Sequence, residues 1–165
     1  MSAKQRMLIA IDDSDASRRA IAYVAAFLAR CADVSVRLFH VLPHLPPETL
    51  EWGGSAEPAK EREFLAEKKA RFIAEAEKTA QPTIDQARKT LDEAGVPEHA
   101  IETQFYLSVA TADIVDDILE VARQGSYSTI VVGRNSWPRL KEAFRHHVCH
   151  ELIKKAHGVS VWVVE

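Results

Sequence analysis

Short runs of hydrophobic residues alternate along the chain with segments in which hydrophobic residues recur every three or four positions. Continuous runs of this length are typical of strands that are buried on both faces of a sheet. The runs span Met7–Asp12, Val34–Leu42, Ala100–Leu107, Ser128–Gly133 and Val159–Val164. The third run alternates only partly between hydrophobic and polar residues, which predicts an edge strand with one wetter face.

The segments between these runs show the i, i+3, i+4, i+7 spacing of helices with one hydrophobic stripe. The stripes are Ile21, Val24, Ala25 and Leu28; Ile114, Val115, Ile118, Leu119 and Ala122; and Val148, Leu152, Ile153 and Ala156. We expect the first helix to begin at Ser14 or Asp15, whose side-chain oxygens can accept hydrogen bonds from first-turn N–H groups. Gly95 and Gly125 follow the second and third main helices, where a left-handed residue commonly ends a helix.

This strict alternation of strand and helix predicts a single α/β domain over residues 1–165. Its expected form is a parallel five-stranded sheet with right-handed crossovers and helices on both faces, a Rossmann-like three-layer α-β-α sandwich. In such sheets ligands bind beyond the carboxyl ends of the strands, where the strand order reverses. That rule points to Asp12–Ser14, Val41–Pro43 and the residues from Gly133 onward.

Residues 43–80 form an insertion into this plan. A proline- and glycine-rich loop over residues 44–58 precedes a charged helix at Ala59–Ala80. We expect Pro82 to break or kink that helix before a packed helix at Thr83–Ala94. The insertion is either an exposed surface segment or a partner-binding arm or lid that uses Trp52.

Composition narrows the class of protein. Of the 165 residues, 47% are hydrophobic and 27% are charged, and 21 Lys and Arg against 24 Asp and Glu give a formal net charge of −3. This balance argues against a protein that coats nucleic acid or an anionic membrane. No hydrophobic run approaches the roughly 20 residues that span a bilayer, and no signal peptide is evident. We therefore expect a cytoplasmic protein in which Cys31 and Cys149 remain thiols.

The chain resembles the universal stress protein family, whose fold is of the adenine-nucleotide α-hydrolase type. The resemblance rests on IAIDDSDASRRAI after the first strand, LFHVLP after the second, TADIVDDILEVARQGSYSTIVVGRNS around the fourth, and the final VSVWVV. It implies a strand order of 3-2-1-4-5. It also implies a homodimer formed through the last strand, here around Val161–Val164, whose edge could pair with a second copy.

Nucleotide-binding members of that family use a G-x2-G-x9-G-[S/T] loop around the phosphates, with an Asp for ribose and a Val for adenine. Asp12 matches the Asp that holds ribose in those members, Val41 matches the Val that holds adenine, and Gly133 matches the first glycine of the loop. The next three loop positions depart from the pattern, because they hold Ser136, His146 and His147.

Glycine suits phosphate loops because no Cβ blocks the approach of backbone N–H groups to oxygen. An imidazole at His146 fills that space, and Pro138 removes a donor. We expect ordinary ATP binding to be lost or much weakened, with no bound cofactor. The alternative is a sensor or weak hydrolase for ATP or another adenine nucleotide, in which Arg134, Arg145 and His147 meet the phosphates.

Three further groups of residues suggest chemistry. His146 and His150 are four residues apart, so they could share a helix face and chelate Zn²⁺. Two ligands do not make a structural zinc site, and on a helix Cys149 points away from His150. The sequence therefore favours the alternative, in which the histidines lie at the surface and Cys149 packs against the sheet. His40 is either a buried, satisfied histidine or a general base in the crevice. Asp12 and Asp13 could bind Mg²⁺, although adjacent residues at a strand end point to opposite sides. No catalytic residue or metal site is predicted.

These observations predict a cytoplasmic stress-response protein that acts as a homodimer through an unknown protein partner. We expect no enzymatic activity and no binding to nucleic acid or membrane.

Overall fold

The computed structural model describes residues 5–31, 33–46, 49, 57–107, 114–134, 136 and 148–165. Its strands are β1 (Gln5–Ile11), β2 (Val34–Leu42), β3 (Ile101–Leu107), β4 (Thr129–Gly133) and β5 (Ser160–Val164). Its helices are α1 (Asp15–Leu28), α2 (Pro58–Glu93), the 3₁₀ turn η2 (Glu98–Ala100), α3 (Ile114–Gln124) and α5 (Val148–Lys155). The strands begin and end within two residues of the predicted positions.

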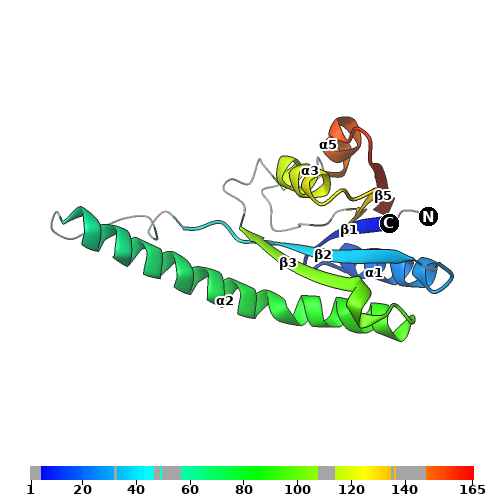
Figure 1. Cartoon of the computed structure of the whole chain (residues 1–165), viewed down its shortest axis with the longest axis horizontal. Helices are drawn as coiled ribbons and strands as arrows, with labels where there is room; N and C mark the ends of the chain where they lie inside the picture. Colours follow the sequence, from blue (N-terminus) through cyan, green and yellow to red (C-terminus); the bar gives the residue numbers. More distant parts are fainter. Residues whose placement is uncertain are drawn as a thin grey trace.

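All five strands are parallel and lie in the order β3-β2-β1-β4-β5, as predicted. Helices α1 and α2 lie on one side of the sheet, and α3 and α5 lie on the other (Figure 1). The three-layer sandwich is therefore confirmed. Because β1 is the central strand, its carboxyl end lies between those of β2 and β4, where the strand order reverses.

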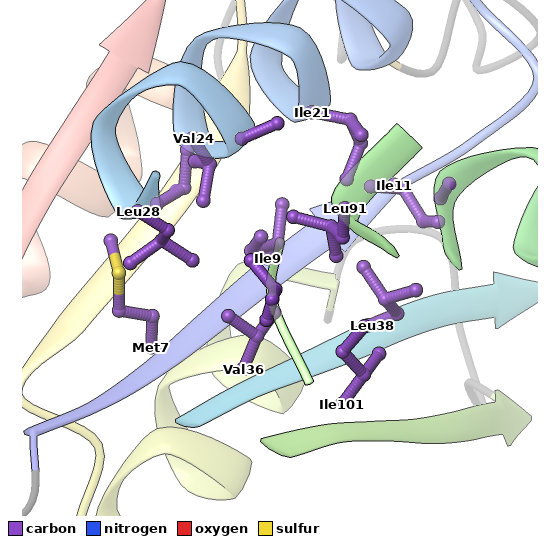
Figure 2. Packing of buried hydrophobic residues seen from close by; sticks show 14 of the residues in the cluster. Met7, Ile9, Ile11, Ile21, Val24, Leu28, Val36, Leu38, Leu91 and Ile101 are labelled. Carbon is purple, nitrogen blue, oxygen red and sulfur yellow. The ribbon is translucent and has the colours of Figure 1, made fainter. Parts of the chain in front are cut away.

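Alternate residues of the central strands point to opposite faces of the sheet and contribute to two separate hydrophobic cores. On β1, Met7, Ile9 and Ile11 pack beneath α1 and α2, whereas Leu8 and Ala10 pack beneath α3 and α5. Figure 2 shows the first core, where side chains from the strands meet those of α1 and α2. Both faces of β1 are buried, which explains why its sequence is a continuous hydrophobic run.

The edge strands are wetter, as their sequences indicate. Glu102 of β3 is exposed, and the guanidinium of Arg37 on the neighbouring β2 binds its carboxylate. Arg37 also donates to the side-chain oxygen of Gln104 at 2.9 Å. Polar pairs on one face of this edge account for the partial alternation of Ala100–Leu107.

Helix α2 differs from the prediction, because it runs without interruption through Pro82 over 36 residues, about 54 Å. Proline removes only one helical hydrogen bond, and its ring costs about 3 kcal/mol in a helix interior. Ile84 and Leu91, which follow it, are buried against the sheet and hold the helix in place. The first half of α2 extends beyond the sheet (Figure 1).

Two smaller predictions are wrong. The left-handed residue after α3 is Ser126 (φ 52°), although Gly95 after α2 is left-handed as expected (φ 87°). Gly125 is needed for a different reason, because a Cβ there would lie 2.7 Å from Cδ2 of the Tyr127 ring. Ile153 is 60% exposed, since the short helix α5 buries only Val148 and Leu152, four residues apart.

Among the described residues, no helix is both long enough and hydrophobic enough to cross a membrane.

Candidate functional site

The structure brings four of the predicted site residues to the carboxyl ends of the strands. Asp12 follows β1, Val41 lies near the end of β2, Gly133 ends β4, and Ser136 follows it. Arg145, His146 and His147 lie outside the described residues, as do Trp52 and Pro138. The described part of the site therefore comprises the strand ends at Asp12 and Val41 and the start of the loop that follows β4.

Asp12 holds the turn from β1 into α1. It is 7% exposed, and its Oδ1 accepts hydrogen bonds from the Ser14 N–H (3.1 Å), the Ser14 hydroxyl and the Ser17 hydroxyl (2.6 Å). The Ser14 hydroxyl in turn accepts from the Ser17 N–H at 3.1 Å, which makes Ser14 the N-cap of α1. One oxygen of this carboxylate is thus already engaged by three donors of its own chain.

Ser136 points inward from the loop toward α1. Its side chain is buried, with Oγ 3.2 Å from Oγ of Ser17, and its N–H donates to the Gly133 carbonyl at 3.1 Å. A hydrogen-bonded chain therefore runs from Asp12 through Ser17 to Ser136 and joins β1, α1 and the residues after β4. The contact between Ser17 and Ser136 depends on tertiary packing, because the two residues are 119 positions apart in the chain.

Gly133 is required by the close approach of α1 to β4. A Cβ at this position would collide with the main-chain carbonyl of Ala16 and would lie 2.7 Å from Oγ of Ser136. The glycine that matches the phosphate-loop pattern therefore also has a packing role in this chain.

His40 lies on β2 beside Ile11 of β1, and only 8% of it is exposed. Burial lowers the pKa of the imidazole, and the nearby charges of Asp12 and Asp13 oppose this effect. Its ring meets the Phe105 ring edge-on with centroids 6.0 Å apart. The predicted burial is confirmed, and within the part of the chain that the structure describes Nδ1 has no hydrogen-bond partner.

A cavity of about 370 Å³ opens next to Asp12, between α1 and α2. Its lining includes hydrophobic Ile11, Ile21 and Ala87, while Ser17 and Gln86 add polar groups. The sequence did not predict that α2 contributes to this site, because nothing in its periodicity identifies the helix that faces it. The cavity has space and mixed polarity suited to a small ring system.

A larger cavity of about 550 Å³ lies at the amino end of the sheet, between α3 and α5. Two of its charged residues, Asp116 and Lys155, form an ion pair at 2.9 Å. We favour the smaller cavity as the site, because it adjoins the carboxyl ends of the strands.

The histidine and cysteine group is only partly described. Cys149 is half-buried on α5, with Sγ 3.7 Å from the Gly133 carbonyl, as expected for a cysteine against the sheet, and His150 is exposed. Within the described ranges, no group of three His, Cys, Asp or Glu residues could hold a metal ion.

An aromatic patch, defined here as Trp162 of β5 with Tyr23 and Phe27 of α1, lies where α1 packs against the edge strand β5. The Trp162 ring meets the Tyr23 and Phe27 rings nearly at right angles, with centroids 6.0 and 5.0 Å apart. Tyr23 is 53% exposed and Phe27 is 39% exposed. This much exposed aromatic surface at a sheet edge is typical of an interaction site.

Main-chain groups of β5 also face that edge. The Ser160 N–H donates to β4 and the Val164 carbonyl accepts from Arg134, so these alternate residues of β5 face β4. Val161 and Val163, which lie between them, direct their N–H and carbonyl groups away from β4.

Comparison with known proteins gives a consistent result. The model of the universal stress protein family matches residues 4–165. A protein of that family from Burkholderia pseudomallei has a similar structure (TM-score 0.62, 18% identity, 99% of this chain and 98% of that chain). A comparison with curated protein sequences gives no match.

Two similar structures contain nucleotides. One is a universal stress protein in complex with cAMP (TM-score 0.56, 19% identity, 99% of this chain and 98% of that chain). The other is the universal stress protein from Archaeoglobus fulgidus in complex with dAMP (TM-score 0.56, 22% identity, 99% of each chain). At these identities the likeness establishes the fold.

Proposed function

Because the chain belongs to the universal stress protein family, we propose that it acts in the stress response as a cytoplasmic homodimer that binds a protein partner. In this proposal the phosphate loop does not bind ATP in the way that is usual in the family, and the protein has no catalytic activity of its own.

The observation that carries the proposal is the hydrogen-bonded chain from Asp12 to Ser136. A loop that binds the phosphates of ATP needs backbone N–H groups that point into the crevice. Here the Ser136 N–H donates to the Gly133 carbonyl, and its hydroxyl lies 3.2 Å from the Ser17 hydroxyl. A triphosphate bound here would have to replace the contacts that the N–H and hydroxyl groups of Ser136 already make with Gly133 and Ser17.

Calorimetric titration with ATP and Mg²⁺ tests this proposal directly. We expect no micromolar binding by the natural protein. The triple variant Ser136→Gly, His146→Gly, His147→Ser restores the family pattern, and we expect it to bind at least about 10-fold more tightly, a gain of about 1.4 kcal/mol. Micromolar ATP binding by the natural protein would contradict the proposal.

A second candidate function is an adenine-nucleotide sensor. It is favoured by the relatives that bind cAMP or dAMP, each with one phosphate, and by the cavity of about 370 Å³ beside Asp12. Such a ligand makes smaller demands on a phosphate loop, and Arg134, Arg145 and His147 could meet its single phosphate. Titration with cAMP and AMP tests this candidate. If either binds, Arg145→Ala should weaken binding about 10-fold, whereas unchanged affinity would exclude this geometry.

The homodimer is proposed to form through β5. Pairing of two antiparallel copies of this strand would satisfy the outward main-chain groups of Val161 and Val163 and bury the aromatic patch. This arrangement leaves the crevice open, because the crevice lies at the carboxyl ends of the strands and the pairing uses the sheet edge.

A further inference from the structure

The cavity between α1 and α2 has one wall that comes from the second half of α2. The residues of that wall lie three, four and seven positions apart from its first member, so they share one helix face. They are Thr83, Gln86, Ala87 and Thr90. Ile11 and Ile21 line the cavity from β1 and α1, on the side of the sheet that Figure 2 shows. The cavity therefore has hydrophobic walls with polar groups added from α2.

The polar groups at the Asp12 end of the cavity direct donors toward other groups of the chain. The Ser17 hydroxyl has a single hydrogen, which it donates to Oδ1 of Asp12 at 2.6 Å. The Arg18 guanidinium donates to the Asp15 carboxylate and to the Asp13 carbonyl, the latter at 2.8 Å. A carboxylate can only accept. This end of the cavity thus offers mainly acceptors, which suit the hydroxyl groups of a ligand and not a phosphate.

The same count of hydrogens applies to the start of the loop after β4. Because Ser17 donates its one hydrogen to Asp12, the Ser136 hydroxyl is the donor in its 3.2 Å contact with Ser17. The Ser136 N–H donates to the Gly133 carbonyl. Both hydrogens of Ser136 that a phosphate would need are therefore already used within the chain.

Gln86 differs from these residues, because its side chain is available to a ligand. It is exposed at the cavity, and within the part of the chain that the structure describes no hydrogen bond engages its amide. By contrast, the neighbouring Thr90 hydroxyl donates to the main-chain carbonyl of Gln86 at 3.0 Å. The amide of Gln86 can donate and accept side by side toward one molecule.

A donor and an acceptor side by side match the edge of a purine base. Glutamine binds adenine through two hydrogen bonds in this way, one from the amino group N6 and one to ring nitrogen N7. Hydrophobic Ile21 and Ala87 suit the faces of such a ring. The volume of about 370 Å³ lies near the lower end of the range for small-molecule sites, about 300–1,000 Å³. A base beside Gln86 and sugar hydroxyl groups beside Asp12 would use both ends of the cavity.

We propose that Gln86 recognises the base of a purine nucleoside in this cavity, and that a phosphate on the nucleoside adds no affinity. The inference rests on the second candidate function, whose cavity it keeps, and it changes the ligand from a nucleotide to a nucleoside. It also differs from the adenine contact that the family resemblance implies for Val41. Val41 packs against the other core and is not among the residues that line the cavity.

Calorimetric titration with adenosine and with AMP tests the role of the phosphate. We expect adenosine to bind, and we expect the Kd of AMP to be no more than 3-fold lower than that of adenosine. AMP binding that is more than 3-fold tighter would overturn this inference and leave the nucleotide sensor in place. Absence of binding by both ligands would overturn the sensor as well.

Purine riboside, which lacks the amino group of adenosine, tests the contact with Gln86. The natural protein should bind adenosine at least 10-fold more tightly than purine riboside, whereas Gln86→Ala should bind the two within 3-fold of each other. The matched control is Gln81→Ala, the same change at an exposed position of α2 outside the cavity, and it should retain the 10-fold preference. Circular dichroism checks that both variants are folded. An equal preference in the natural protein and in Gln86→Ala would overturn the assignment.

Discussion

At the scale of single residues, the candidate site is shaped by contacts between small polar side chains. Ser17 donates to the Asp12 carboxylate, accepts from the Asp12 N–H at 2.9 Å, and lies against Ser136. Each group is buried, and a buried polar group that loses its partner costs about 1–3 kcal/mol. These residues therefore stabilise the crevice as much as they offer groups to a ligand.

His40 makes stability depend on pH. Its pKa in the folded protein is lowered from the ordinary value of 6.5, mainly by burial, so the unfolded chain binds a proton more readily. Its contribution to the free energy of unfolding is complete above pH 6.5 and decreases as the pH falls below that value. Urea unfolding of the natural protein and of His40→Phe at pH 5.0–7.5 measures this contribution. The natural protein should lose more stability toward pH 5 than the variant, and parallel pH profiles would contradict the assignment.

Gly133 should be intolerant of any side chain. We expect Gly133→Ala to lower the free energy of unfolding by about 3 kcal/mol, because the added Cβ meets the main chain of Ala16 rather than a movable side chain. Gly95→Ala is the matched control, since its Cβ would have no neighbour within 4 Å and only its positive φ is strained, a cost of about 1–2 kcal/mol. Chemical denaturation of both variants measures which substitution lowers the free energy of unfolding more. A smaller loss for Gly133→Ala than for Gly95→Ala would show that α1 and β4 can separate.

At the scale of elements, α2 shows how packing overrides local preference. Pro82 predicts an interruption, yet the helix continues because Ile84, Ala87 and Leu91 are buried beyond it. The buried residues of α2 all lie at or after Ala80, so it is the second half of this helix that packs against the rest of the protein. The periodicity of hydrophobic residues predicts a helix here but does not show where along the helix its contact with the sheet begins.

Replacement of Pro82 should stabilise the protein. Pro82→Ala restores an N–H group that can donate to the Lys78 carbonyl and removes the clash of the ring, so we expect the free energy of unfolding to rise by about 1–2 kcal/mol. The control is Gln81→Ala at the neighbouring exposed position, which loses only a surface hydrogen bond to Asp85. Thermal and urea unfolding measure both variants. A loss of stability in Pro82→Ala would indicate that the ring makes a favourable contact in the cavity that it lines.

At the scale of the whole molecule, the β5 edge of the sheet is the surface through which we propose that two copies of the chain pair. This edge offers the outward main-chain groups of Val161 and Val163, and the aromatic patch lies beside it. A dimer of this kind would bring two crevices into one particle, an arrangement suited to binding protein partners.

The β5 contact should depend on the main chain at Val163. Val163→Pro removes an outward N–H group, and we expect it to raise the dimer Kd at least 10-fold while leaving the bonds between β4 and β5 in place. Val163→Ala is the control, because it shortens the side chain and retains the N–H group, and its Kd should change less than 3-fold. Sedimentation equilibrium measures both variants. A dimer of unchanged affinity in Val163→Pro would exclude pairing through this strand.

The sequence by itself determined the strands, most of the helices and the order in which they follow one another along the chain, because the spacing of hydrophobic residues follows the repeat of each element. It also located Asp12, Val41 and Gly133 at the strand ends, since parallel strands bring their carboxyl ends to one edge. Only the tertiary structure decided that Ser136 turns toward Ser17, that α2 passes through Pro82, and that α2 lines the cavity. Those features depend on contacts between residues far apart in the chain, and such contacts follow from packing rather than from local periodicity.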